Sequence, residues 1–421
     1  MAEEYLARIF DKELEIALTT FGAVLIEGPK WCGKTWTSER HSSSAIYLQD
    51  IKERERYLET AKVAPDILLA GEAPRLIDEW QTIPALWDGV RFEVDRRRKK
   101  GQFILTGSTR LKKNMTMHTG TGRIARLVMR PMSLFESLES NGEVSLSSLF
   151  EGRDVTGESS LSLERLDFAL VRGGWPASVG DDSRTAFRHA RNYVRTITEE
   201  DISSDDSDKS PRTVERLMLS IARNISTPAK NKTIMDDVSG NRGEHSISYK
   251  TYANYVDALT RLFVIDDLPA WSPSIRSRVT LMTSPKHHFT DPSIAAALLR
   301  VSPDGLMQDF RTFGLLFESL CIRDLRVYAQ PLDGEVYHYR DGSDLEVDAV
   351  VHLYDGRWGA IEIKMGWGDI EKAAGNLKKL RDKIDIEHMR KPSFLMVLTT
   401  GGFAFRREDG VYVVPIECLR D

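Results

Sequence analysis

The chain has 421 residues, which is too many for one ordinary hydrophobic core, so we expect two to four domains. Hydrophobic residues make up 41% and charged residues 29%, as is usual for a globular protein in water. No apolar run reaches the roughly 20 residues needed to cross a bilayer, and the first residues lack the pattern of a signal peptide. We therefore expect a cytoplasmic protein without membrane association.

A net charge of −5 gives no overall nucleic-acid signal, so DNA binding would depend on local basic patches. Runs of this kind are also common on solvated surfaces, and the candidates are residues 96–100, 112–113 and 276–288. The three cysteines, Cys32, Cys321 and Cys418, lie far apart without metal-ligand spacing. They predict neither a disulfide framework nor a zinc site.

Residues 1–132 alternate short apolar strands with helical patterns, which is the layout of a parallel α/β sheet. Several strands are continuous apolar runs, as expected where both faces of a sheet are covered. The expected strands are residues 23–26, 45–48, 75–78, 103–106 and 125–128.

Residues 28–35 match the G-x-x-x-x-G-K-[ST] phosphate-loop motif and directly follow the first strand. Glycines let backbone N–H groups turn toward phosphates, and a helix expected to begin at Lys34 adds positive potential. Lys34 would contact the β- and γ-phosphates of ATP, and the Thr35 hydroxyl would bind Mg²⁺. The predicted ATP-binding residues are Gly28, Pro29, Lys30, Trp31, Cys32, Gly33, Lys34, Thr35 and Trp36.

An acidic pair ends the third strand, at the edge where α/β sheets place ligand groups. We expect Asp78 to hold Mg²⁺ and Glu79 to act as general base on the attacking water. The next strand ends in a polar segment, so Thr106 or Ser108 is the candidate sensor of the γ-phosphate; a locally satisfied hydroxyl is the alternative. Arg123 is a candidate arginine finger for a neighbouring subunit, although a surface salt bridge explains it equally well.

Residues 133–205 have a helical pattern that is broken by a Gly/Ser-rich stretch near 152–162. Residues 203–211 are acidic and polar, which is typical of a linker. This composition predicts a domain boundary near residue 205.

An amphipathic helix is expected over 248–262, with Tyr252, Tyr255, Leu259 and Leu262 at helical spacing. With the apolar segments that follow, this region resembles a winged helix-turn-helix. Arg242, Lys250 and Arg261 could contact DNA phosphates. The aromatic stripe is more often core, and such a module can equally dock a protein.

A long helix is expected over 313–328, followed by a strand-rich region. Residues 345–351 and 360–364 alternate as strands, and a turn at Asp355-Gly356 joins them into a hairpin. Asp348 shares a face with Glu346, and Glu362 shares a face with Lys364. Two carboxylates and a lysine on one hairpin can bind Mg²⁺ and place an activated water near a phosphodiester.

This hairpin resembles the PD-(D/E)xK nuclease fold. The resemblance implies that Asp348 and Glu362 bind metal, that Lys364 is the catalytic lysine, and that Glu318 on the preceding helix is a further acidic ligand. The proline of the motif is absent, because Ser343-Asp344-Leu345-Glu346 leads into the aspartate. A solvent-facing charged hairpin and a degenerate nuclease used only for binding are the alternatives, so cleavage is left open.

Most of the chain resembles the bacterial and archaeal AAA-type ATPases that carry a C-terminal DUF4143 domain, with a looser match over 135–210. The resemblance is carried by residues 28–35, 76–81, 105–108, 122–123, 130–133 and 173–176. It implies an α/β fold of four parts: a P-loop AAA-like core over 1–132, a helical lid over 133–205, a winged-helix-like module over 206–275, and a restriction-endonuclease-like domain over 276–421.

We therefore expect an oligomeric, DNA-associated ATPase that uses ATP and Mg²⁺ to remodel or translocate DNA, with branched DNA as a candidate substrate. The alternative is a regulatory NTP switch whose nuclease-like domain is an inactive adaptor in protein complexes of stress response, defence or toxin control. A metabolic kinase is a distant third reading, because no separate acceptor site is visible.

Overall fold

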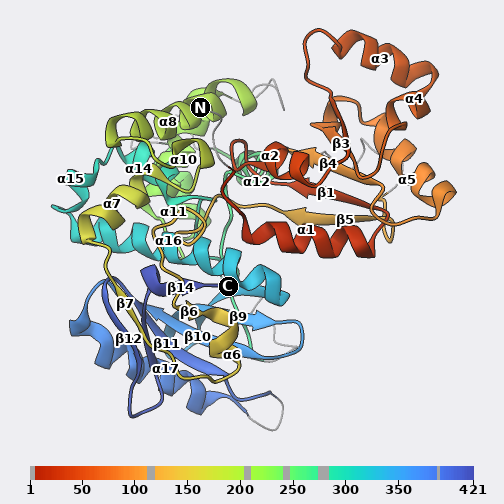
Figure 1. Cartoon of the computed structure of the whole chain (residues 1–421). Coiled ribbons are helices and arrows are strands. Elements are labelled where there is room, and N and C mark those ends of the chain that lie inside the picture. Colours follow the sequence, from red (N-terminus) through yellow and green to blue (C-terminus); the bar gives the residue numbers. More distant parts are fainter. Residues whose placement is uncertain (1–4, 111–118, 203–209, 240–246, 274–283, 386–388) are drawn as a thin grey trace. The chain divides into compact units, whose positions relative to one another are not determined.

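The computed structural model describes residues 5–110, 119–202, 210–239, 247–273, 284–385 and 389–421 (Figure 1). Contacts divide the chain into two compact units. The first contains Met1–Pro131 and Arg261–Val264, and the second contains Met132–Thr260 and Ile265–Asp421.

The first unit is built on a five-stranded sheet in the order β2-β3-β4-β1-β5, with every pairing parallel. All five expected strands are confirmed to within one residue. In this order β4 lies between β1 and β3. The strands are β1 (Ala23–Glu27), β2 (Ser44–Tyr47), β3 (Arg75–Asp78), β4 (Phe103–Gly107) and β5 (Ile124–Val128).

Both faces of this sheet are covered, which explains the continuous apolar runs. Leu25 packs with Trp87 in one apolar cluster, while Val24 packs with Phe10 and Leu14 in another. Alternate residues of β1 therefore enter different cores. The helices of this unit are α1 (Ile9–Thr20), α2 (Lys34–Arg40), α3 (Arg54–Val63), α4 (Pro65–Leu69) and α5 (Ala85–Arg97).

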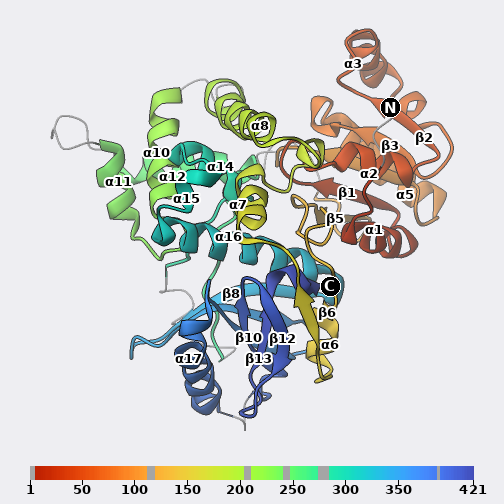
Figure 2. The same cartoon turned by 60° about the vertical axis from the view of Figure 1, so that its left-hand side comes forward.

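The second unit contains a seven-stranded mixed sheet in the order β7-β12-β13-β11-β10-β9-β8. Its long helix α16 (Phe310–Ala329) contacts β8 and β9, and α17 (Ile370–Lys383) packs on β10 and β11 from the other side (Figure 2). The long helix and the hairpin expected here are confirmed. The strands are β7 (Gly157–Ser159), β8 (Gly334–Arg340), β9 (Glu346–Leu353), β10 (Trp358–Ile363), β11 (Phe394–Thr399), β12 (Gly402–Arg406) and β13 (Tyr412–Pro415).

Residues 133–205 are not wholly helical, so the expectation of a helical lid is wrong for part of this range. β6 (Val144–Ser145) pairs with β14 (Leu419–Arg420), and β7 pairs with β12. These short strands join the C-terminal strands through backbone hydrogen bonds. Side-chain periodicity does not report such pairing.

Helices on both sides of residue 205 pack together in the second unit. α14 contacts α7, α8 and α10, and these contacts bury most of its small apolar residues. The expected boundaries at 205 and 275 therefore do not separate compact units. The remaining helices are α6 (Leu146–Phe150), α7 (Leu163–Arg172), α8 (Ser183–Thr196), α10 (Pro211–Arg223), α11 (Asn231–Ser239), α12 (Tyr249–Arg261), α14 (Pro292–Leu299) and α15 (Pro303–Leu306).

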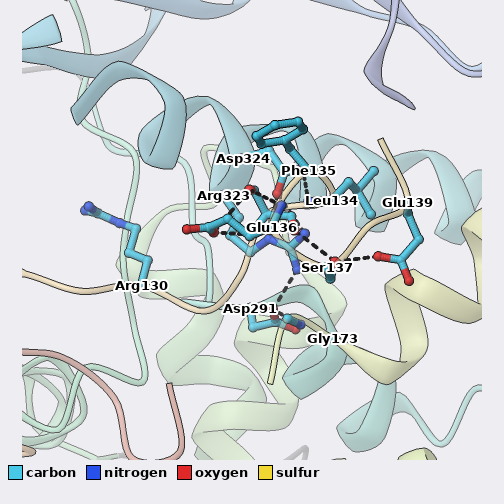
Figure 3. A network of polar contacts seen from close by, with 12 residues as sticks. Arg130, Leu134, Phe135, Glu136, Ser137, Glu139, Gly173, Asp291, Arg323 and Asp324 are labelled. Atoms are coloured by element: carbon cyan, nitrogen blue, oxygen red, sulfur yellow. Dashed lines mark hydrogen bonds and ion pairs between the residues drawn. The ribbon is translucent and has the colours of Figure 1, made fainter. Parts of the chain in front are cut away.

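A buried polar network centred on Arg323 of α16 holds distant segments of this unit together (Figure 3). The Arg323 guanidinium contacts Asp291 at 2.8 Å and Asp324 at 2.7 Å. Asp291 also accepts a hydrogen bond from the Gly174 backbone N–H, and Asp324 accepts one from the Leu134 N–H, both at 2.9 Å. Two segments that carry the family resemblance, 130–133 and 173–176, thus lie in or beside a structural network.

No helix in the described part of the chain combines the length and the apolar character that a membrane span requires.

Candidate nucleotide site and a second charged cluster

The phosphate loop connects β1 to α2, and α2 begins at Lys34 as predicted. A Cβ atom on Gly28 would lie 2.2 Å from the carbonyl oxygen of Met129, so a side chain cannot be accommodated there. Gly33 precedes α2 with φ of 99°, in the left-handed region that favours glycine. Both motif glycines are therefore required by the local backbone.

Lys34 is buried, and its Nζ donates to the carbonyl oxygens of Gly28 at 3.0 Å and Pro29 at 2.7 Å. Its ammonium group is thus held inside the loop, where the motif predicts that phosphates bind. Within the loop Cys32 is buried, whereas Trp31 is 46% exposed. Of the other predicted ATP-binding residues, Lys30 and Trp36 are half-buried.

Asp78, at the end of β3, meets Thr35 from the start of α2. One oxygen, Oδ1, accepts hydrogen bonds from the Thr35 hydroxyl at 2.9 Å and the Thr106 hydroxyl at 2.7 Å. Burial raises the pKa of Asp78. Adjacent hydroxyl and carboxylate oxygens are the hard ligands that Mg²⁺ prefers, so these residues fit the predicted metal.

Glu79 is held in place by residues at the end of β4 and by one residue of the turn that follows β3. Its backbone N–H donates to Thr106 Oγ1 at 2.9 Å, and its Oε2 accepts from Ser108 Oγ at 3.0 Å and from Gln81 Nε2. The structure therefore brings together both sensor candidates, Thr106 and Ser108, at the acidic pair. Which of them senses the γ-phosphate stays a prediction.

Gln81 was not expected at this site. Its Oε1 is buried and has no hydrogen-bond partner among the described residues. The sequence does place a polar residue two positions after the proposed base Glu79. Its spacing alone does not predict the site, because spacing does not fix the direction of a side chain in a tight turn.

Arg8 is a second unexpected contributor. Its guanidinium donates to the carbonyl oxygens of Cys32 and Arg130, both at 2.8 Å. These partners are 24 and 122 residues away in sequence, so no local pattern could reveal them. Arg8 ties the phosphate loop to the segment that follows β5.

Arg123 has a local partner, because its Nε donates to Asp95 Oδ1 at 3.0 Å and both side chains are about half exposed. The surface salt bridge expected as the alternative is present. An arginine-finger role in a neighbouring subunit stays a prediction.

The predicted nuclease-like residues form a second charged cluster in the C-terminal sheet. Lys364 Nζ lies 2.9 Å from Asp348 Oδ2 and 2.7 Å from Glu362 Oε2, which confirms the shared face of the hairpin. Glu318 of α16 joins the cluster through Lys286, which sequence reasoning did not assign to this site. Lys286 Nζ lies 2.8 Å from Glu318, 3.1 Å from Glu346 and 3.6 Å from Asp348.

Lys286 belongs to the segment 276–288 that was a candidate DNA-binding patch. Residues 276–283 lie outside the described residues, but Lys286, His287 and His288 are all buried. The expectation of a DNA contact is therefore wrong for these three residues. An antiparallel bridge between Lys286 and Leu268 anchors this segment, with the Lys286 side chain among the carboxylates.

Burial and the two lysines act in opposite directions on the carboxyl groups of this cluster. Burial raises the pKa of Glu318 and of Glu362. Burial also tends to raise the pKa of Asp348, but Lys286 and Lys364 together hold it below its usual value. Within the described residues, no group of three or more His, Cys, Asp or Glu side chains could hold a metal ion.

The predicted aromatic stripe of α12 is core. Tyr252, Tyr255 and Leu259 are all buried. Lys250 is exposed, and Arg242 lies outside the described residues. A DNA-contacting role for this helix stays a prediction.

A hollow of about 570 Å³ in the second unit lies between α8, α10 and the end of α14. It carries more positive than negative side chains, since its charged lining consists of Arg191, Arg195, Arg212, Arg300, Glu199 and Glu215. Arg195 pairs with Glu199 at 2.8 Å.

Three protein-family models match separate parts of the chain. The model described as "AAA domain" matches residues 20–138, that of the domain of unknown function DUF8612 matches 163–305, and that of DUF4143 matches 313–419. The first match covers the phosphate loop, Asp78 and Glu79. It supports the assignment of this region as an AAA-type ATPase domain.

Two curated relatives are uncharacterized proteins, Mb2031c of Mycobacterium bovis and Rv2008c of Mycobacterium tuberculosis. Each is 25% identical over 359 residues, which is 83% of this chain and 72% of the relative.

Among solved structures, an ORC2 protein of Aeropyrum pernix in ADPNP and ADP complexes is 14% identical, with a TM-score of 0.30. That match covers 72% of this chain and 92% of that one. A signal-transduction ATPase (STAND) of Pyrococcus horikoshii with a tetratricopeptide-repeat sensor is also 14% identical, with a TM-score of 0.27. It covers 79% of this chain and 50% of that one. TM-scores this low support no conclusion about this chain.

Proposed function

We propose that the protein binds ATP with Mg²⁺ and hydrolyses it at the site formed by the phosphate loop and the end of β3. The observation that carries this proposal is the hydrogen bond between Thr35 and Asp78, beside Glu79 and a buried Lys34. It joins the two predicted metal-binding groups, one from the loop helix and one from the acidic strand.

Each residue has a distinct task in this reaction. Lys34 exchanges the carbonyl oxygens of Gly28 and Pro29 for the β- and γ-phosphates. Thr35 and Asp78 would hold Mg²⁺, which would neutralise charge on the phosphates. Glu79 accepts a proton from the attacking water, and Ser108 and Gln81 fix the direction of its carboxylate.

We propose that DNA is the partner on which the protein uses the energy of ATP hydrolysis. The arginine-lined hollow between α8 and α10 supports this assignment, because arginine side chains are common contacts of phosphate oxygens. Residues 98–100 add an exposed basic segment in the first unit. We propose a homo-oligomer, in which Arg123 reaches the γ-phosphate of a neighbouring subunit.

ATP turnover measured with duplex, branched and single-stranded DNA tests this proposal. DNA should stimulate turnover, and Lys34→Ala should abolish it. The double variant Arg212→Glu/Arg300→Glu should lose the stimulation, whereas Lys372→Glu, an exposed charge reversal on α17, should keep it. Turnover that persists in Lys34→Ala would reject the ATP site, and turnover that ignores every DNA would reject the DNA partner.

A regulatory NTP switch is the second candidate, in which the C-terminal sheet serves as an adaptor in protein complexes. The lysine-bound carboxylates of that sheet favour it, because an adaptor needs no reactive centre. This candidate predicts ATP-dependent assembly with a protein partner, measured as particle mass, together with turnover that DNA does not change.

A further inference from the structure

The PD-(D/E)xK resemblance implies a divalent metal at the carboxylates of the C-terminal hairpin, and the side chains present do not fit one. We infer that Lys286 is a built-in counter-ion that takes the place of this metal, so that the C-terminal sheet neither binds a catalytic metal nor cleaves phosphodiesters. The inference does not depend on ATP hydrolysis in the first unit.

The position of Lys286 carries the inference. Its Nζ lies within 3.6 Å of oxygens of three carboxylates from two elements: Glu318 on α16, and Glu346 and Asp348 near the start of β9. An ammonium group has three N–H donors, and three carboxylates surround this one. A metal that used Glu318 and Asp348 together would have to lie next to this positive charge, which repels it.

Lys364 fills the remaining side of the cluster. Its Nζ bridges Asp348 and Glu362 at 2.9 and 2.7 Å. Each of the three carboxylates that the nuclease resemblance assigns to metal therefore has a lysine partner. Asp348 has two, and it also accepts a hydrogen bond from the backbone N–H of Ile363 at 2.8 Å.

Lys286 is fixed by its surroundings, which distinguishes it from a mobile catalytic lysine. Its side chain is only 2% exposed. Its backbone N–H donates to Leu268 O at 3.0 Å, and its carbonyl oxygen accepts from Leu268 N–H at 2.9 Å. The neighbouring His288 is buried and contacts Ser319 of α16 at 3.1 Å. A lysine held in this way is a structural cation.

The test replaces Lys286 by methionine, which has a similar length but no charge, in the full chain without nucleotide. The carboxylates then lose a cation, so Lys286→Met should melt at a lower temperature and should bind Mn²⁺ at least tenfold more tightly than the wild type. Added Mn²⁺ should raise the melting temperature of the variant and leave that of the wild type unchanged. Lys378→Met is the matched control, because Lys378 pairs with Asp409 at 2.7 Å outside the cluster.

A second measurement uses the wild type and so does not depend on the folding of any lysine variant. It should not cut duplex, branched or single-stranded DNA in Mg²⁺ or Mn²⁺. DNA cleavage that Asp348→Ala abolishes would overturn the inference. Binding of Mn²⁺ to the nucleotide-free wild type that Asp348→Asn abolishes would overturn it too, as would a Lys286→Met variant that folds and gains no Mn²⁺ affinity.

Discussion

The phosphate-loop site and the hairpin cluster combine the same residue types, lysine and carboxylate. In the first, Lys34 donates to backbone carbonyl oxygens, and Asp78 accepts from two hydroxyl groups. In the second, Lys286 and Lys364 bind carboxylates directly. The difference lies in the partner of each lysine and not in the residues themselves.

This difference separates a site ready for ligands from one whose charges are already compensated. The Lys34 and Asp78 hydrogen bonds each join a charged group to a neutral one and contribute about 1.5–3 kcal/mol. Removing one partner of a buried ion pair costs more, about 3–5 kcal/mol. We therefore propose that similar residues bind metal in one unit of the chain and exclude it in the other.

The largest effect is expected on ATP turnover, from a substitution of Glu79 in the phosphate-loop site. Glu79→Gln removes the proposed base but keeps the size of the side chain, so ATP binding should persist while turnover falls by roughly 10²–10⁴-fold. Steady-state turnover and equilibrium ATP binding measure the two effects separately. Glu72→Gln, an exposed change that follows α4, is the control. Unchanged turnover in Glu79→Gln would remove Glu79 from the base role.

Glu417 provides a buried carboxyl for contrast with the lysine-bound ones. It accepts a hydrogen bond from the Gly401 N–H at 3.1 Å, and burial raises its pKa to about 7. The folded state therefore keeps a proton that the unfolded state releases above about pH 4.3, its ordinary pKa. The free energy of unfolding should fall as pH rises from there to about 7, and should then level off.

Glu417→Gln should remove this pH dependence and should stabilise the protein at pH 8 by at most about 4 kcal/mol. Asp348 should show the opposite sign in a lower range, below about pH 4, because its pKa is lowered and its contribution is lost as pH falls through that range. Denaturant unfolding at pH 5 and pH 8 is the measurement, with the exposed Glu408→Gln as control. An equal pH dependence in wild type and Glu417→Gln would contradict the assignment.

Arg8 tests whether the phosphate loop is preorganised. Arg8→Lys keeps the charge but cannot reach both carbonyl oxygens in the same geometry, so it should lower the free energy of unfolding by about 2 kcal/mol. ATP affinity should fall by about tenfold, as measured by titration. Arg54→Lys, an exposed substitution at the start of α3, should change neither quantity. If Arg8→Lys binds ATP as tightly as the wild type, the hydrogen bonds of Arg8 do not preorganise the phosphate loop.

The smallest effect on stability is expected at Arg123. Its pair with Asp95 is half exposed, so Arg123→Ala should change the free energy of unfolding by less than about 1 kcal/mol. Turnover measured over a range of protein concentrations then isolates catalysis. If Arg123→Ala loses turnover only at the protein concentrations at which the chain assembles, the result supports the arginine finger. If the variant and the wild type turn over ATP equally at every concentration, the arginine finger is rejected.

Much of the first unit could be predicted because its signals are local. Apolar runs gave the five strands, and the spacing within 28–35 gave the loop and the start of α2. The hairpin was also predictable, because alternation places Asp348, Glu362 and Lys364 on one face. Short strands such as β6 and β7 were not, since their pairing depends on backbone groups far away in sequence.

The partners that decide chemistry were harder to predict than the reactive residues. Arg8 reaches Arg130 across 122 residues, and Lys286 reaches Glu318 and Asp348 from a segment that sequence alone presents as a basic surface run. Only tertiary packing decides whether such a lysine faces solvent or a carboxylate. Basic character in a sequence therefore predicts the charge but not its partner.

Counting bound Mn²⁺ in the full chain, with and without a non-hydrolysable ATP analogue, tests the contrast between the two clusters most directly. We predict one tightly bound Mn²⁺ per chain with the analogue and none without it. Asp78→Ala should abolish this binding, and Asp348→Ala should leave it unchanged. A tightly bound Mn²⁺ that needs no nucleotide and disappears in Asp348→Ala would contradict the account.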